Sequence, residues 1–195
     1  MNQKIVAILL FIFNLFVNVR ANANCKIDSG DRVISEFENA VRLHIFTTKG
    51  KYETLEVKQC HLDGINLNKN CKSTSRVKLI VHGFMERWNM KTRWNWIEDL
   101  KNELFDSPDS NNLCIIAVDW KELGTGGKIP NYWQAISNMK IAGELISTVL
   151  NNSNIDIKKT HCVGFSLGAH MCSILLKTYF NRFNVKVGRL TGLDP

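Results

Sequence analysis

The sequence predicts an α/β fold in which a mostly parallel sheet is flanked by helices. From residue 77 onward, short apolar runs of strand length alternate with longer segments whose apolar residues recur at helical spacing. The second run, residues 113–120, is apolar almost throughout, as is typical of a strand buried on both faces of a sheet. Because strand–helix–strand order repeats, we expect parallel strands covered by helices.

The expected elements follow one another closely along the chain. The strands are predicted over residues 77–81, 113–120, 160–165 and 185–190. The helices are predicted over residues 92–105, 130–150 and 166–180. Pro130 is well placed just inside the start of the second helix. The apolar residues that share one side of that helix are Trp133, Ile136, Ile146 and Val149.

Residues 31–58 have a different pattern, which predicts an antiparallel edge to the sheet. Segments 42–46 and 52–55 have the composition of two strands that turn at residues 49–51. Such a hairpin would make the sheet mixed. The sequence contains no internal repeat, low-complexity tract or linker that would indicate a second domain.

The first 23 residues are predicted to be a secretory signal peptide. Lys4 precedes an apolar run over residues 5–19, and Ala21-Asn22-Ala23 matches an A-x-A cleavage pattern. A membrane anchor is the alternative, but this run is short for a bilayer core of about 30 Å. We therefore expect a secreted protein that starts at residue 24 and has no transmembrane segment after cleavage.

The charge of the chain limits its expected partners. Removal of the signal peptide lowers the formal net charge from +7 to +5, because Lys4 and Arg20 are lost. A basic protein can favour anionic lipid surfaces, but the lysines are scattered, so ordinary solubility is the preferred interpretation. No zinc-ligand spacing or basic helix is present, so we expect no nucleic-acid partner.

Six cysteines in a secreted chain indicate disulfide bonds, although the sequence permits 15 pairings. Cys60 and Cys71 flank a polar stretch and are expected to close it as a loop. The absence of a C-x-x-C pair gives no support to a zinc site or a thioredoxin-like motif.

The other four cysteines differ in their surroundings. Cys162 lies in an apolar strand and Cys172 on an apolar helix, so either is a candidate for a buried free thiol. That assignment would leave Cys25 to tie the N-terminus to Cys114.

The main catalytic signal is the G-x-S-x-G run at residues 164–168. A serine hydroxyl is a weak nucleophile and must be presented to a base, which a sharp turn from strand to helix achieves. Side chains at Gly164 and Gly168 would crowd this turn. An apolar strand precedes Ser166 and a helix is predicted to follow it, so we predict that Ser166 is a nucleophile at a helix N-terminus.

An acyl-transfer serine also needs donors for the oxyanion. The backbone N–H of Leu167 directly follows the nucleophile, and the loop after the first parallel strand offers the N–H of Phe84. The alternative is that His82-Gly83 is only a strand-ending turn.

Asp194 is the predicted acid of a catalytic triad because it follows the nucleophile and the last strand. A simple Asp-Pro turn is the alternative. All histidines precede Asp194, whereas this class of enzyme places its base after the acid. The five histidines are His44, His61, His82, His161 and His170. None of them is a good candidate for the base.

Four sequence blocks together resemble the pancreatic-type lipase family of α/β-hydrolases. They are Leu79 to Phe84 (LIVHGF), Ile116 to Trp120 (IAVDW), Gly164 to His170 (GFSLGAH) and Leu190 to Pro195 (LTGLDP). Within that family, the chain looks most like the insect and venom phospholipase A1 branch. Family elbows usually carry histidine at the position of Phe165, which is not catalytic.

The resemblance implies a serine esterase that cleaves glycerolipid or phospholipid ester bonds without a cofactor. It implies Ser166 as nucleophile, Asp194 as acid, and Phe84 and Leu167 as oxyanion donors. It also implies that the chain is incomplete at the C-terminus, because the family's catalytic histidine, lid and remaining strands would lie beyond Pro195.

Two further expectations concern lipids. Trp88 follows the oxyanion loop and is a candidate for peripheral contact with a lipid interface. A non-catalytic secreted protein that binds or stores ligands is the alternative function. The presence of Ser166 argues against that alternative, and the missing histidine argues for it.

Overall fold

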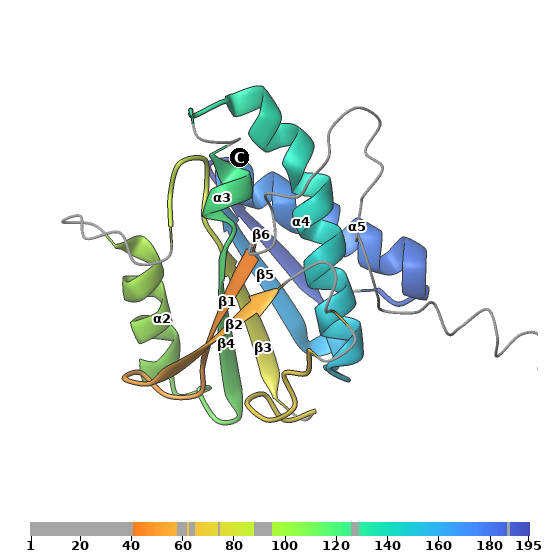
Figure 1. The fold of residues 1–195 in the computed structure, drawn as a ribbon. Helices are drawn as coiled ribbons and strands as arrows, with labels where there is room; N and C mark the ends of the chain where they lie inside the picture. Colours follow the sequence, from red (N-terminus) through yellow and green to blue (C-terminus); the bar gives the residue numbers. More distant parts are fainter. Residues whose placement is uncertain are drawn as a thin grey trace, which may run out of the picture. The chain divides into compact units, whose positions relative to one another are not determined.

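A six-stranded mixed sheet with helices on both faces forms the fold (Figure 1). The structure is a computed structural model that describes residues 41–57, 62, 65–73, 75–87, 95–125, 129–186 and 188–195. The strands are β1 (Val41–Phe46), β2 (Tyr52–Val57), β3 (Arg76–Val81), β4 (Leu113–Asp119), β5 (Thr160–Phe165) and β6 (Arg189–Leu193). The helices are α2 (Trp96–Asp106), α3 (Lys121–Gly124), α4 (Tyr132–Asn152), the 3₁₀ helix η2 (Ile157–Lys159) and α5 (Leu167–Phe183).

The strands are ordered β2-β1-β4-β3-β5-β6 across the sheet. Strands β4, β3, β5 and β6 are parallel, and β1 is antiparallel to both β2 and β4. The predicted α/β class, the parallel strands and the antiparallel hairpin edge are therefore confirmed. All of these elements belong to one compact unit within residues 35–195.

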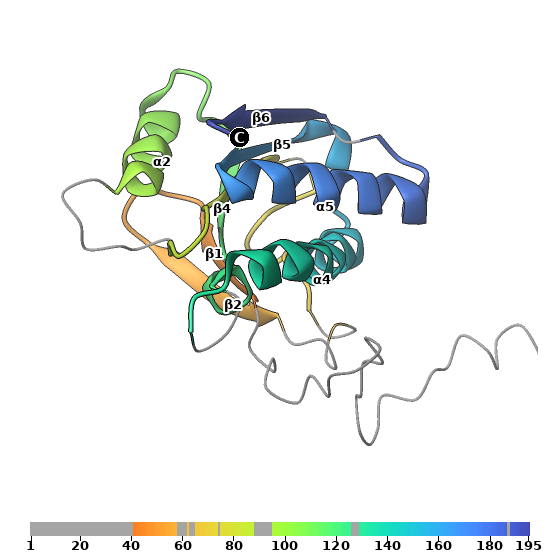
Figure 2. The ribbon, with the colours of Figure 1, turned by 90° about the horizontal axis from the view of Figure 1, so that it is seen from above.

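Side chains alternate between two apolar layers, one on each face of the sheet. Leu79 and Ile116 point into the larger layer with α4 and α5, whereas Ile80 and Ala117 point into the smaller layer with α2. Figure 2 shows α2 on one side of the sheet and α4 and α5 on the other. This arrangement explains why the central strands are apolar at nearly every position.

The last strand begins later than the sequence predicts. Strand β6 starts at Arg189, four residues after the predicted start, because α5 continues to Phe183 and ends at Asn184 in the left-handed conformation (φ 55°). The chain then passes so close to η2 that a Cβ on Gly188 would lie 2.1 Å from the carbonyl oxygen of Lys158. Residues 184–186 and 188 thus connect helix and strand.

The apolar side of α4 is only partly buried. Ile146 and Val149 are fully buried, but Trp133 is 77% exposed. Trp133 lies in the first turn of α4, which projects past the ends of the strands (Figure 1). The apolar side that the sequence predicts is therefore buried at Ile146 and Val149 but exposed at Trp133, where the sheet does not extend under the helix.

Two disulfide bonds correct the predicted cysteine pairing. Cys71 bonds to Cys114 with a Cα–Cα distance of 5.6 Å. The predictions that Cys71 pairs with Cys60 and Cys114 with Cys25 are therefore wrong. The reason is spatial, since residues 65–73 return to the side of β4 that carries Cys114. Cys25 and Cys60 lie outside the described residues.

The second bond joins Cys162 to Cys172, with a Cα–Cα distance of 5.9 Å. The prediction that either is a free thiol is wrong. Strand β5 turns directly into α5, so the helix passes back over the strand and brings the two residues together. All cysteines among the described residues are oxidised.

Two other predictions concern the membrane and the N-terminus. The signal peptide at residues 1–23 lies outside the described residues and stays a prediction. Among the helices that the structure describes, none is long and apolar enough to cross a membrane.

We expect the two disulfides to stabilise the fold unequally. The Cys71–Cys114 bond closes 43 residues and the Cys162–Cys172 bond closes 10, so loop entropy predicts losses of about 4 and about 3 kcal/mol when each is removed. Paired Cys→Ala variants, unfolded in urea, would measure this order. A larger loss for the Cys162 and Cys172 pair would contradict it.

Candidate active site

Ser166 lies between β5 and α5 in a strained backbone conformation. Its φ is 50° and its ψ is −124°, a region that non-glycine residues rarely adopt. Its N–H donates to the carbonyl oxygen of Leu193 at 2.9 Å, and its carbonyl oxygen accepts from the N–H of Ala169 at 2.8 Å. These bonds hold the turn in the geometry predicted for a nucleophile elbow.

The two glycines of the motif occupy positions where no side chain fits. A Cβ on Gly164 would lie 2.2 Å from the carbonyl oxygen of Gly168. A Cβ on Gly168 would lie 2.2 Å from the carbonyl oxygen of Val81 and 2.6 Å from that of His82. The start of α5 therefore packs directly against the end of β3.

The turn after β3 also lies against the serine. A Cβ on Gly83 would lie 3.2 Å from both the Cβ of Ser166 and the carbonyl oxygen of Phe165. The N–H of Gly83 donates to Oε2 of Glu86 at 2.6 Å. Phe84 follows Gly83 and Leu167 follows Ser166, so each predicted donor is next in the chain to one of the two residues in this contact.

Backbone strain is concentrated at this end of the sheet. Six described non-glycine residues have positive φ, and three of them are asparagines, which tolerate that conformation. The others are Met85, Ser166 and Asp194, with φ of 61°, 50° and 45°. All three lie in the turn after β3, at the turn between β5 and α5, or after β6. Such clustering is typical of functional sites.

Asp194 is the neighbour of Ser166 across the sheet. In the parallel pair of β5 and β6, Phe165 is opposite Leu193, so the next residues are Ser166 and Asp194. Adjacent strands lie about 4.8 Å apart. Asp194 is exposed. The structure therefore brings the two predicted catalytic residues to one edge.

The described histidines do not form a base for Ser166. Nδ1 of His44 lies 2.8 Å from Oγ1 of Thr54. His161 contacts Nζ of Lys78 at 3.0 Å and Oγ1 of Thr191 at 2.9 Å. Burial, followed by the charges of Lys78 and Arg189, lowers the pKa of His161 to about 4. His161 is therefore neutral near pH 7, and it is the second residue of β5, at the far end of the strand from Ser166.

The other histidines are also excluded as a base. Both ring nitrogens of the buried His82 contact neighbouring polar groups, and His170 is exposed on α5. His61 lies outside the described residues.

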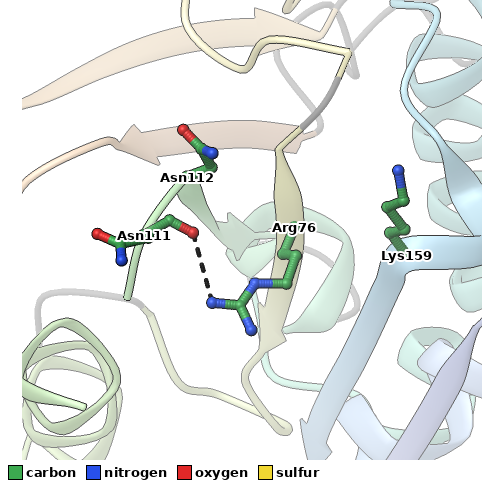
Figure 3. A pocket seen from close by; sticks show the side chains of 4 residues that line it. All are labelled: Arg76, Asn111, Asn112 and Lys159. Atoms are coloured by element: carbon green, nitrogen blue, oxygen red, sulfur yellow. Dashed lines mark hydrogen bonds between the residues drawn. The ribbon is translucent and has the colours of Figure 1, made fainter. Parts of the chain in front are cut away.

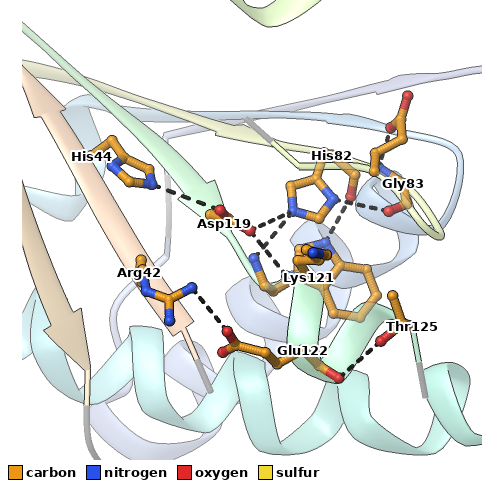
Figure 4. Close-up of polar contacts among 10 residues, drawn as sticks. Arg42, His44, His82, Gly83, Asp119, Lys121, Glu122 and Thr125 are labelled. Atoms are coloured by element: carbon orange, nitrogen blue, oxygen red, sulfur yellow. Dashed lines mark hydrogen bonds and ion pairs between the residues drawn. The ribbon is translucent and has the colours of Figure 1, made fainter. Parts of the chain in front are cut away.

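Asp119, an acid for which the sequence predicted no role, lies beside the turn at His82 and Gly83. Asp119 ends β4, and its Oδ1 is 3.3 Å from Nε2 of His82 and accepts from the N–H of Lys121 at 3.1 Å. Its Oδ2 is 3.8 Å from Nε2 of His44 (Figure 4). The signal was present in the sequence, because Asp119 is a charge at the end of an otherwise apolar strand.

The ionised form of Asp119 is strongly favoured. Burial raises the pKa of this carboxyl, but hydrogen bonds from His44 and His82, the charge of His82 and the N–H of Lys121 outweigh burial. The net effect holds the pKa of Asp119 well below its ordinary value.

Exposed and half-buried apolar side chains gather at the turn after β3 and at the start of α4. The Phe84 and Tyr132 rings meet edge to face at 5.3 Å, and the Tyr132 and Trp133 rings at 6.0 Å. Met85, Ile129 and Trp133 are 52%, 83% and 77% exposed. We call these five residues the apolar rim.

A shallow hollow lies at the opposite end of the parallel strands. It is lined by Arg76, Asn111, Asn112 and Lys159 (Figure 3). These residues begin or precede β3, β4 and β5, whereas Ser166 follows the end of β5. The hollow is therefore separate from the elbow. The described residues contain no group of three or more His, Cys, Asp or Glu side chains able to hold a metal ion.

Comparison with known proteins decides the family. A family model described as lipase matches residues 19–195. The chain belongs to the lipase family. It is 31% identical to mouse pancreatic triacylglycerol lipase over 132 residues, which cover 66% of this chain and 25% of that protein. It is 32% identical to the human pancreatic triacylglycerol lipase over 133 residues, which cover 65% of this chain and 25% of that protein.

A further lipase relative is named as inactive. The chain is 31% identical to the mouse inactive pancreatic lipase-related protein 1 over 130 residues, which cover 65% of this chain and 24% of that protein. The chain thus spans about a quarter of the length of these relatives. The predicted resemblance to pancreatic-type lipases is confirmed, and membership of this family alone does not establish activity.

In this lipase-family chain, we expect Gly168→Ala to damage the elbow. Its new Cβ would meet two backbone carbonyls that cannot move independently, at a cost of about 3 kcal/mol. Urea unfolding would measure this cost. The control is Gly50→Ala, whose Cβ would meet no atom within 4 Å and whose stability should stay within about 0.5 kcal/mol. Equal stability of the two variants would contradict the packing argument.

Proposed function

We propose that the full-length protein is a secreted carboxylic ester hydrolase of glycerolipids that acts by acyl transfer through Ser166. The observation that carries the proposal is the strained Ser166, which is placed between the turn at Gly83 and the residue that follows β6. Membership of the lipase family supports the class of reaction.

In the proposed reaction, Oγ of Ser166 attacks the ester carbonyl carbon while a histidine takes the hydroxyl proton. The negative charge then develops on the carbonyl oxygen, where the N–H groups of Phe84 and Leu167 would stabilise it. One such donor is worth about 3 to 4 kcal/mol of transition-state stabilisation. The histidine returns the proton to the leaving alcohol, and water then hydrolyses the acyl-enzyme through the same groups.

Asp194 is proposed to orient that histidine and to stabilise its charged form. No histidine of these 195 residues follows Asp194. The chain corresponds to about a quarter of the relatives' length, and we propose that the base lies in the part of the protein that these residues do not cover.

The proposed substrates are glycerolipid esters, either phospholipids or triacylglycerols. Two of the compared relatives are named triacylglycerol lipases, which supports the second class. The resemblance to the phospholipase A1 branch supports the first. The predicted signal peptide and the two disulfides support secretion, because disulfides persist in oxidising compartments.

A non-catalytic lipid-binding protein of the same fold is the second candidate function. It is favoured by the similarity to a relative named inactive. It would not require the strained serine or the glycines that make room for it.

We expect Ser166→Ala to abolish ester hydrolysis by the full-length protein and to prevent labelling by a serine-directed phosphonate. The reason is the loss of the only proposed nucleophile. Hydrolysis of a short-chain ester, with covalent labelling measured by mass spectrometry, tests this outcome. His170→Asn serves as an exposed control on the same helix and should keep wild-type activity. Turnover by Ser166→Ala would refute the mechanism, and an inert wild type would favour the binding protein.

We also propose that the apolar rim contacts the lipid surface. Tryptophan and tyrosine side chains favour a lipid–water interface, and adsorption strengthens with the apolar area that it buries. The rim includes Phe84, so a surface held by it would lie beside the proposed catalytic edge. Trp88, the earlier candidate for this role, lies outside the described residues.

We expect Trp133→Ala to weaken binding of the full-length protein to phosphatidylcholine vesicles roughly tenfold, or about 1.4 kcal/mol. Cleavage of a soluble short-chain ester should be unchanged. Phe180→Ala is the matched control, since Phe180 is a 40% exposed aromatic residue near the C-terminal end of α5, away from Ser166. Equal vesicle binding by the two variants would argue against the rim as the contact surface.

A further inference from the structure

A buried polar network contacts the turn at residues 82–84, which follows β3. Its members are Asp119, the last residue of β4, Trp120, which follows it, and His82, which follows β3. His82 and Trp120 are fully buried, so each polar contact between them forms away from water. Polar groups buried in this way are costly to leave unpaired.

The imidazole ring of His82 contacts the turn directly. Nδ1 lies 2.9 Å from the carbonyl oxygen of Gly83. A carbonyl oxygen can only accept, so Nδ1 carries the proton and donates it. Nε2 lies 3.3 Å from Oδ1 of Asp119 and 3.2 Å from the backbone nitrogen of Trp120. With a proton it donates to the carboxylate, and without one it accepts from the N–H of Trp120. Both ring nitrogens are thereby engaged.

Trp120 holds the same residue through its backbone. Nε1 of its indole donates to the carbonyl oxygen of His82 at 2.8 Å. The indole also stacks on the imidazole, with ring centroids 5.9 Å apart and an angle of 25° between the rings. The ring and the main chain of His82 therefore contact two consecutive residues, Asp119 at the end of β4 and Trp120 directly after it.

The side of the turn that faces Ser166 and α5 is closely packed. Gly83 is packed against Ser166, and the carbonyl oxygens of Val81 and His82 lie against Gly168. A shift of His82 would therefore move Gly83 and the N–H that follows it, relative to the nucleophile. Misplacement of a catalytic donor by about 1 Å can cost a factor of about 100 in rate.

From this geometry we infer that Asp119 and Trp120 are positioning residues that hold the 82–84 turn, and with it the N–H of Phe84, in register with Ser166. The inference rests on the proposed ester hydrolysis. Neither side chain needs to touch the substrate. Their effect would reach the reaction only through His82 and the backbone of the turn.

The test compares Trp120→Phe and Asp119→Asn in the full-length protein. The first removes one donor and keeps an aromatic ring, and the second removes the charge and keeps the shape. We expect kcat on a short-chain ester to fall about tenfold or more in each, with KM within a factor of two. Labelling of Ser166 by a phosphonate should slow in parallel, because it uses the same oxyanion donors.

Lys101→Met is the matched control for general destabilisation. Lys101 is 3% exposed, and its Nζ donates to the carbonyl oxygen of Lys49 at 2.8 Å and to Glu98 at 2.5 Å, in a region where α2 meets the β1–β2 turn. We expect its melting temperature to fall while kcat stays unchanged.

The outcomes separate the inference from the proposed function. An unchanged kcat in the folded Trp120→Phe and Asp119→Asn variants would overturn the inference. Failure of Trp120→Phe to fold would also overturn it, because Trp120 would then be needed for the stability of the whole domain. A wild-type protein without turnover would instead overturn the proposed function.

Discussion

The close approach of α5 to the end of β3 is the constraint on which the rest of the site depends. Gly168 lies so near the carbonyl oxygens of Val81 and His82 that a methyl group would not fit between them. This contact sets the height of the serine above the sheet and the position of the turn at Gly83 at the same time. The network at Asp119 then holds the turn from the opposite side.

Much of the fold could be predicted from periodicity. Strand β5 has the predicted bounds, and the hairpin and the strand order along the chain were visible in the alternation of apolar residues. The elbow could be predicted because the sharp turn at the serine leaves no space for side chains two residues before and after it. This steric requirement for glycine is visible in the local sequence alone. The end of α5 could not be predicted, because the left-handed conformation of Asn184 and the packing of Gly188 against η2 depend on tertiary contacts.

Features that join distant segments were the hardest to predict. The partner of Cys71 is decided by which side of β4 the segment returns to, and periodicity carries no such information. Asp119 is similar, because its neighbours come from β1, from the turn after β3 and from α3. The exposure of Trp133 could not be predicted either, because helical spacing shows which residues share a face but does not show where the sheet beneath that face ends.

The disulfide between Cys162 and Cys172 encloses the whole elbow in a covalent ring. Ser166 lies near the middle of the 10-residue separation, and both cysteines are fully buried. Local opening of a domain usually begins in segments that can separate from their neighbours without breaking covalent bonds. This segment cannot separate strand from helix while the bond is intact. The covalent ring therefore opposes local opening around Ser166, independently of any opening at the edges of the sheet.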